Sequence, residues 1–253
     1  MSNYFKNFKV DRYRFGDEQY SILFQRLSTY IDVLDRVQDN LSVYTNTTIL
    51  SNERPDTLSY RIYGTTDYYW TFYLMNEKLR QQSWPLTDKR VYEKSEEIYN
   101  GYFGRLDFVD LNAYNTLMQQ ISLLYPVGES VNLVTSGAAK RAATVKSKNL
   151  QNAEIYFTSS AVLNSDTIVS VEYADTSNSY NFSAFDFEFN GTHHYTKTGS
   201  AVEYDLVDNP IDPGTPVTFQ ENFIAVNEDV RQIRVIKPDE IEKVVGEFNR
   251  LVS

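Results

Sequence analysis

This sequence contains few of the residues that commonly act in catalysis, and their spacing does not fit a known catalytic motif. The chain has no cysteines, which excludes a thiolate nucleophile, a disulfide and a thiolate metal site. Its two histidines, His193 and His194, are adjacent and in a strand would point to opposite faces, so we do not expect them to share a metal ion. They follow Asn190-Gly191, a pair that predicts a two-residue hairpin turn between strands.

Serine and carboxylate chemistry is equally unsupported. The G-x-S-x-G nucleophile elbow is missing, and the segment 136–140 lacks the leading glycine and the Gly-Lys-Ser/Thr end of a phosphate-binding loop. Neighbouring acids such as Glu96 and Glu97 diverge by about 100° on a helix, so they do not converge on one substrate. We therefore predict that the protein is not an enzyme and takes no cofactor, metal or small-molecule substrate.

An aromatic-rich stretch, residues 54–76, predicts two short helices folded back on each other. Asp56 is suited to cap the first helix, and Gly64 supplies the left-handed residue that ends it. Thr65 or Thr66 would then cap the second helix, whose aromatic residues share one face.

The residues of this stretch resemble a LysM module, a small β-α-α-β fold. In particular, Glu53-Arg54-Pro55-Asp56, then Ile62-Tyr63-Gly64 and Tyr69-Trp70, resemble the LysM-like wedge subunit of contractile-tailed (myovirus-type) bacteriophage baseplates. The similarity extends to Trp84-Pro85-Leu86 and resumes in the tail from Arg231. Residues 43–51 read as the first strand of this unit and 231–237 as its last strand.

The fold class that follows is α+β, with a split LysM-like unit that is completed by a C-terminal helix and interrupted by a long insert. Short β-prone segments between turn residues predict that the insert holds a small barrel or sandwich. We predict five consecutive segments: an N-terminal arm and helix (1–42), the first part of the LysM-like unit (43–80), a helical connector (81–126), an inserted all-β domain (127–228), and the closing strand and C-terminal helix of the LysM-like unit (229–253).

The resemblance implies a structural protein of the virion, located in the tail baseplate and assembled in the host cytoplasm. It implies that the LysM-like unit clasps the helical core bundle of larger wedge subunits, contacts the sheath-proximal wedge protein, and so clamps neighbouring wedges together. We predict that the protein interface contains four residues of the clasp and three of the terminal helix: Arg54, Tyr63, Tyr69, Trp70, Ile241, Val245 and Phe248.

Composition limits the other partners. With 34 acids against 24 bases, the net charge of −10 disfavours binding to nucleic acid backbones. The sequence has no apolar signal segment and no run near the roughly 20 apolar residues of a membrane span, so we expect a soluble protein. The alternative function is binding of peptidoglycan, an N-acetylglucosamine polymer, as a LysM module of a tail-associated protein.

Overall fold

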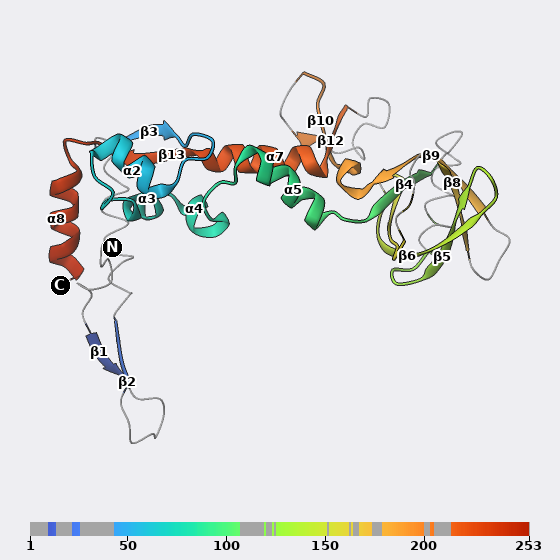
Figure 1. The fold of residues 1–253 in the computed structure, drawn as a ribbon, viewed down its shortest axis with the longest axis horizontal. Helices are drawn as coiled ribbons and strands as arrows, with labels where there is room; N and C mark the ends of the chain where they lie inside the picture. Colours follow the sequence, from blue (N-terminus) through green and yellow to red (C-terminus); the bar gives the residue numbers. More distant parts are fainter. Residues whose placement is uncertain are drawn as a thin grey trace. The chain divides into compact units, whose positions relative to one another are not determined.

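The computed structural model describes residues 10–13, 22–25, 43–106, 119, 123, 125–150, 152–161, 163, 167–173, 179–199, 203–204 and 214–252. The chain divides into two compact units, which we describe separately (Figure 1). Unit 1 combines Met1–Asp88 with Val226–Ser253, and unit 2 is Lys89–Ala225. Both helices and strands are present, which confirms the predicted α+β class.

The sheet of unit 1 joins two segments that lie far apart in the sequence. Strand β3 (Tyr44–Thr48) pairs antiparallel with β13 (Gln232–Ile236), and the two lie side by side in Figure 1. Arg234 lies opposite Asn46 in the middle of an unbroken register. The predicted pairing of the tail with residues 43–51 is therefore confirmed. The likeness of this unit to LysM stays a prediction.

The helices of unit 1 are α2 (Pro55–Tyr63), α3 (Trp70–Met75), α4 (Glu77–Gln82) and α8 (Ile241–Val252). Gly64 ends α2 in the left-handed conformation, at φ 72°, as predicted. The cap of α2 differs from the prediction: Arg54 is the N-cap, and Asp56 lies inside the first turn. Pro55 explains the shift, because proline's fixed φ suits the first helical position.

Helix α3 begins later than the predicted cap at Thr65 or Thr66. Its first residue is Trp70, and the residues before it form turns. The Thr65 hydroxyl accepts a hydrogen bond from the Asp67 backbone N–H at 3.3 Å. Threonine here closes a local turn, a common alternative to capping a helix.

Two apolar clusters make the core of unit 1. The larger one joins the sheet to α2, α3 and α4 through Ile49, Leu58, Phe72, Leu79, Val230, Ile233 and Val235. The smaller one joins the sheet to the start of α8 through Met75, Ile236 and Ile241. The first strand and the tail thus share their buried side chains with the helices between them.

Two short strands precede this core. Strands β1 (Val10–Tyr13) and β2 (Ile22–Gln25) pair antiparallel. Within the predicted N-terminal arm and helix (1–42), the spacing of apolar residues from Leu27 to Leu41 predicts a helix over 21–41. That prediction is wrong at its start, where residues 22–25 pair with β1 as strand β2. Residues 26–41 of that prediction, and most of the predicted N-terminal arm, lie outside the described residues.

Unit 2 contains a closed barrel, so the barrel alternative of the insert prediction is the one observed. Its strand order is β4-β7-β6-β5-β8-β9. The strands are β4 (Tyr102–Leu106), β5 (Ser130–Thr135), β6 (Lys140–Asn149), β7 (Glu154–Thr158), β8 (Ile168–Tyr173) and β9 (Ser179–Phe187). Strand β4 comes from the segment predicted to be a helical connector. Gly104 on β4 is required for packing, since a Cβ there would lie 2.3 Å from the Phe182 ring.

A smaller sheet in unit 2 replaces the predicted hairpin at Asn190-Gly191. The order is β11 (Glu203–Tyr204), β10 (Thr192–Thr196), β12 (Thr215–Thr218). Between β9 and β10 lies a 3-10 helix, η3 (Glu188–Asn190), so β10 does not pair back onto β9. The buried carboxylate of Glu188 explains the change, because it accepts a hydrogen bond from the Gly101 N–H at 2.9 Å and anchors η3 to the barrel.

The two remaining described helices are α5 (Asp88–Ile98) and α7 (Phe219–Arg231). Helix α5 lies in the segment predicted to be a helical connector (81–126). Helix α7 corrects the prediction that β structure reaches residue 228 and that a strand begins at Arg231. The Thr218 hydroxyl accepts from the Glu221 N–H at 3.1 Å and Glu221 accepts from the Thr218 N–H at 2.8 Å, which starts the helix. Residues 107–124 of the same predicted connector lie outside the described residues, except for 119 and 123.

Candidate protein interface around Arg54 and Trp84

Glu53 organises the turn that precedes α2. Its carboxylate accepts from Arg61 Nε at 2.6 Å, from Arg61 Nη2 at 2.9 Å and from the Leu50 N–H at 2.9 Å. Its backbone oxygen accepts from Trp84 Nε1 at 2.7 Å. Burial alone would raise the pKa of Glu53, but the bonds from Arg61 and Leu50 lower it below its ordinary value. The Glu53 carboxylate is therefore an anionic anchor for the turn and α2, while its backbone oxygen holds Trp84.

The segment that follows Trp84 is fixed by the other end of the chain. Asn227 accepts from the Leu86 N–H at 2.7 Å and donates to the Leu86 carbonyl at 3.2 Å. Arg231 donates to the same carbonyl at 2.9 Å and to Asp88 Oδ1 at 2.7 Å. Because Asn227 and Arg231 are buried, this segment cannot move without breaking four buried or half-buried hydrogen bonds.

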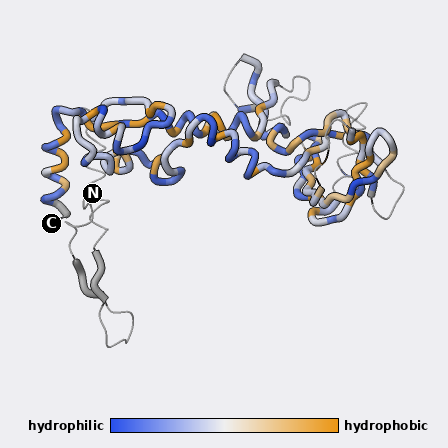
Figure 2. Tube along the Cα trace, viewed as in Figure 1, coloured by the Kyte–Doolittle hydropathy of each residue, from blue (hydrophilic) through white to orange (hydrophobic). Residues whose placement is uncertain are grey.

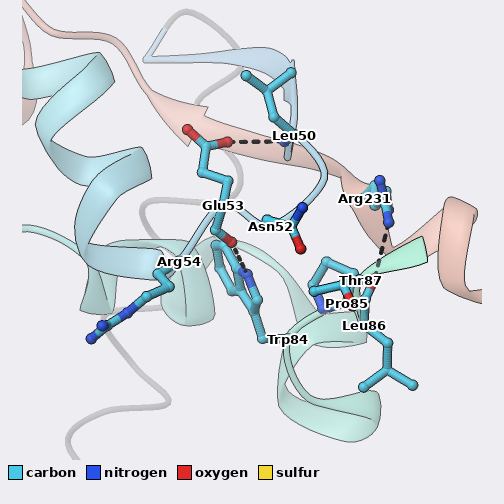
Figure 3. Close-up of a pocket in the computed structure, with 9 residues that line it drawn as sticks. All are labelled: Leu50, Asn52, Glu53, Arg54, Trp84, Pro85, Leu86, Thr87 and Arg231. Carbon is cyan, nitrogen blue, oxygen red and sulfur yellow. Dashed lines mark hydrogen bonds between the residues drawn. The ribbon is translucent and has the colours of Figure 1, made fainter. Parts of the chain in front are cut away.

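These contacts surround a hollow of about 160 Å³ in unit 1 (Figure 3). It brings together the Glu53-Arg54 and Trp84-Pro85-Leu86 motifs, which carry the resemblance. The lining residues are Leu50, Asn52, Glu53, Arg54, Trp84, Pro85, Leu86, Thr87 and Arg231. The lining thus combines aromatic and aliphatic residues with polar residues and with charged residues of both signs.

Arg54 presents its side chain to solvent at this hollow. The side chain is 77% exposed, and its Nε lies 3.2 Å from Asp56 Oδ1. In Figure 3 it extends away from Trp84 and Arg231. Leu50, also at the hollow, is 56% exposed, and Tyr60 on α2 is another exposed large side chain. Sequence reasoning missed Leu50 and Tyr60, because exposure of a single apolar residue leaves no pattern in the sequence.

Tyr63 and Tyr69 face inward by comparison. The Tyr63 hydroxyl donates to the Ile236 carbonyl at 3.0 Å, and its ring stacks on Phe72 with 6.0 Å between ring centroids. Burial raises the pKa of Tyr63 to about 12. Tyr69 is half-buried and packs against the larger core cluster. In this structure both side chains make contacts inside unit 1 and so stabilise its fold.

The predicted residues of the terminal helix are brought to Trp70 and to the smaller cluster. Phe248 is 1% exposed, with its ring centroid 4.8 Å from that of Trp70. Ile241 is buried, and Val245 is half-buried against the smaller cluster. Figure 2 shows orange and blue bands alternating along α8, as expected for an amphipathic helix. The structure therefore brings Trp70 and Phe248 together and leaves Arg54 as the most exposed of the predicted residues.

The adjacent histidines of unit 2 do face each other, contrary to the prediction. A register shift between Thr192 and His194 allows His193 Nδ1 to lie 2.8 Å from His194 Nδ1. Burial and the charge of His194 lower the pKa of His193. Within the described part of the chain, no group of three or more metal-ligating side chains gathers.

In unit 2, the buried carboxylate of Glu154 is held by hydrogen bonds from neighbouring strands. Glu154 accepts from Arg105 Nη2 at 2.7 Å, from the Tyr156 hydroxyl at 2.6 Å and from the Thr192 hydroxyl at 3.0 Å. Thr192 belongs to β10, so this network ties the smaller sheet to the barrel. The sequence gives no signal of the network, because its members come from three separate strands.

Residues 22–112 match the family model described as base plate wedge protein 53. The match confirms the predicted resemblance to a phage baseplate wedge subunit. A structural role in the phage baseplate, within the virion tail, follows from it. The matched residues include Glu53, Arg54 and Trp84 but not Arg231, which also lines the hollow.

No curated protein matches this chain. Among the described residues, no helix combines the length and apolar character needed to cross a membrane.

Proposed function

We infer that this protein clamps neighbouring baseplate wedges together through protein–protein contacts made by unit 1. Its role would be structural: it would hold the surfaces of neighbouring proteins together and would not convert a substrate. The proposed partners are other wedge proteins: the helical core bundle of the larger subunits and the sheath-proximal wedge protein. Assembly would take place in the host cytoplasm before the tail is complete.

The observation that carries this proposal is the hollow beside Arg54. At about 160 Å³ it is smaller than the roughly 300–1,000 Å³ of small-molecule pockets, and its size suits a single inserted side chain. Its wall is held in place by hydrogen bonds from Trp84 to Glu53 and from Arg231 to Leu86. A rigid wall lowers the conformational entropy that association would cost.

Arg54 would add specificity at the rim. A guanidinium offers a planar pair of donors that matches a carboxylate, and its exposed position allows it to reach a partner. Leu50 supplies apolar area beside it. An apolar anchor flanked by an arginine is a common composition at the centre of protein interfaces. Under this proposal Tyr63, Tyr69, Trp70, Ile241, Val245 and Phe248 act from within, by fixing the helices that carry the contact surface.

The test is size-exclusion chromatography with light scattering, on the chain alone and mixed with the other purified wedge proteins. We expect wild type to co-elute with a partner. Arg54→Glu should weaken the complex by at least about tenfold, equivalent to roughly 1.4 kcal/mol. Lys89→Glu, the same charge reversal at an exposed residue of unit 2, should bind within about twofold of wild type.

A wild-type chain that stays monomeric beside every wedge protein would overturn the proposal. So would an Arg54→Glu variant that binds like wild type. A second mixture, with insoluble peptidoglycan, addresses the glycan alternative: retention that chitin oligomers compete away would replace the clamp with a cell-wall-binding function.

A further inference from the structure

The two-stranded sheet of unit 1 has two outer edges, and the edge of β13 is closed by side chains. Asn76 Nδ2 donates to the Arg234 carbonyl at 2.7 Å, and Asn76 Oδ1 accepts from the Arg234 N–H at 2.8 Å. Tyr63 donates to the carbonyl of Ile236 on the same edge. No further strand can pair there without displacing these groups.

The edge of β3 is different. Because Arg234 turns its backbone groups outward, its register partner Asn46 must do the same on the far side of the sheet. Alternate residues Tyr44 and Thr48 follow the same direction. The Thr48 carbonyl accepts from Arg61 Nη2 at 3.1 Å. Within the described chain, no hydrogen bond reaches the backbone groups of Tyr44 or Asn46 on this edge.

Strand β3 also lacks the features that usually prevent strand addition. Its sequence, Tyr-Thr-Asn-Thr-Thr, contains no charge and no proline, and its register with β13 has no bulge. Proteins protect exposed edges with such features because an unpaired edge is a template for another strand. Here the protection is present on β13 and missing on β3.

Both faces beside this edge are incomplete. Thr45 lies directly opposite Val235 on the core side of the sheet, yet Val235 is buried and Thr45 is exposed. On the other face, the Arg234 guanidinium lies 5.0 Å from the centroid of the Tyr44 ring. No carboxylate of the described residues forms an ion pair with Arg234. The edge therefore offers free backbone groups, uncovered core-side area and an unneutralised cation.

We propose that the outer edge of β3 is a docking site for an acidic extended segment of a partner protein, which adds to the sheet as a third strand. Backbone hydrogen bonds to Tyr44 and Asn46 would supply affinity, and alternate side chains would supply specificity. A carboxylate on the outer face would pair with Arg234, and an apolar residue on the inner face would cover Thr45. The idea rests on the proposed role in a protein assembly, and it names the surface and the chemistry of the partner.

A synthetic seven-residue peptide of alternating valine and glutamate serves as the probe, because as a strand it places all carboxylates on one face. The chain, labelled with ¹⁵N, is titrated with this peptide and with its valine–lysine counterpart. We expect amide shift changes at Tyr44, Asn46 and Thr48, and slower hydrogen exchange at Asn46. The lysine peptide should bind at least about tenfold more weakly, and Arg234→Gln should reduce that preference.

Two variants block the edge in different ways. Asn46→Pro removes an outward N–H that the β3–β13 ladder does not use, so the ladder amides of Thr45 and Thr47 should keep their protection. Asn46→Glu places a carboxylate on the edge and should repel the acidic peptide without proline's backbone strain. Both variants should lose the shift changes.

Several results would overturn the proposal. They are no change at β3 with millimolar peptide, equal response to both peptides, or protection of Asn46 that grows with protein concentration alone, which would indicate pairing between two copies. The same variants in the wedge-protein mixture separate the two proposals. If wild type and Asn46→Pro bind equally, the docking edge is wrong and the clamp stands; if wild type binds no wedge protein, the clamp fails whatever the peptide does.

Discussion

Asn76 pairs with the backbone of Arg234 as a strand would, with its Nδ2 2.7 Å from the carbonyl oxygen and its Oδ1 2.8 Å from the nitrogen. It also donates to the Phe72 carbonyl at 2.8 Å and so ends α3. One side chain thus joins the helices of unit 1 to the strand supplied by the tail, 158 residues later.

Replacing Asn76 by alanine should destabilise unit 1 by about 1–3 kcal/mol, because backbone groups lose their partners. Asn76→Asp should not restore stability, since the Phe72 and Arg234 carbonyls need a donor. Both tryptophans, Trp70 and Trp84, belong to unit 1, so tryptophan fluorescence during urea unfolding measures this unit alone. Gln81→Ala, which removes a surface bond to Glu77, is the control and should change stability by less than about 0.5 kcal/mol. Equal effects of the two alanine variants would refute the bridging role.

Glu53 should make the stability of unit 1 sensitive to acid. Its pKa is lowered in the folded chain, so its contribution is complete above the unfolded pKa of about 4.5 and is lost as the pH falls through the lower folded pKa. Glu53→Gln should cost about 1.5–3 kcal/mol at pH 7 and progressively less below pH 4.5. Urea unfolding followed by tryptophan fluorescence from pH 7 to 3 measures this. Glu240→Gln, beside Lys243 near the surface, is the control, and a constant difference between wild type and Glu53→Gln at all pH values would contradict the account.

Tyr63 should make the stability of unit 1 sensitive to high pH. Its folded pKa of about 12 lies above the ordinary 10, so the folded state holds the proton more tightly. The contribution is complete below pH 10 and is lost as the pH rises through about 12. Tyr63→Phe should cost about 1 kcal/mol at pH 8, from the lost bond to Ile236, and should flatten the loss of stability between pH 10 and 12. Other buried tyrosines remain in both proteins, so the comparison isolates Tyr63, and parallel curves would rule the assignment out.

The stability of unit 2 should depend on the buried carboxylate of Glu154. Its carboxylate is fully buried, and Glu154→Gln leaves Arg105 without its anionic partner, so we expect a loss of about 3–5 kcal/mol. Glu172→Gln, which removes a partly exposed pair with Lys140, should cost less than about 1 kcal/mol. Calorimetry should show the transition of unit 2 shifted downward, while tryptophan fluorescence of unit 1 stays unchanged. A similar small effect of both variants would show that the network contributes little.

Local chemistry explains what could be predicted from the sequence. Gly64 ends α2 because few other residues adopt a left-handed backbone, and the alternation of Ile233 and Val235 marks β13 as half-buried. The pairing of β13 with β3 followed from the resemblance to a known module. Periodicity alone offers no means of matching strands so far apart.

The predictions that were wrong depend on contacts between residues that are distant in the sequence. Helix α7 lies partly in the segment predicted to be all-β. Phe219 packs its ring against Tyr99 and Tyr156, and the bonds between Thr218 and Glu221 start a helix there, so contacts that the local sequence pattern does not show decide the outcome. Asn190-Gly191 is a strong hairpin signal, but the buried Glu188 anchors a 3-10 helix there instead. Of the residues predicted for the interface, Phe248 is buried against Trp70, whereas Leu50, which the proposed contact uses, is exposed. Both depend on which surfaces the fold covers, which the spacing of residues does not encode.

Photo-cross-linking in assembled tails tests the central claim most directly. Leu50, which lines the hollow, is replaced by photoreactive benzoylphenylalanine, and Val127, a similarly exposed apolar residue of unit 2, is replaced in a control. The account predicts that position 50 cross-links to another wedge protein in high yield and that position 127 does so weakly or not at all. A chain that cross-links to no wedge protein from position 50, or does so equally from position 127, would contradict it.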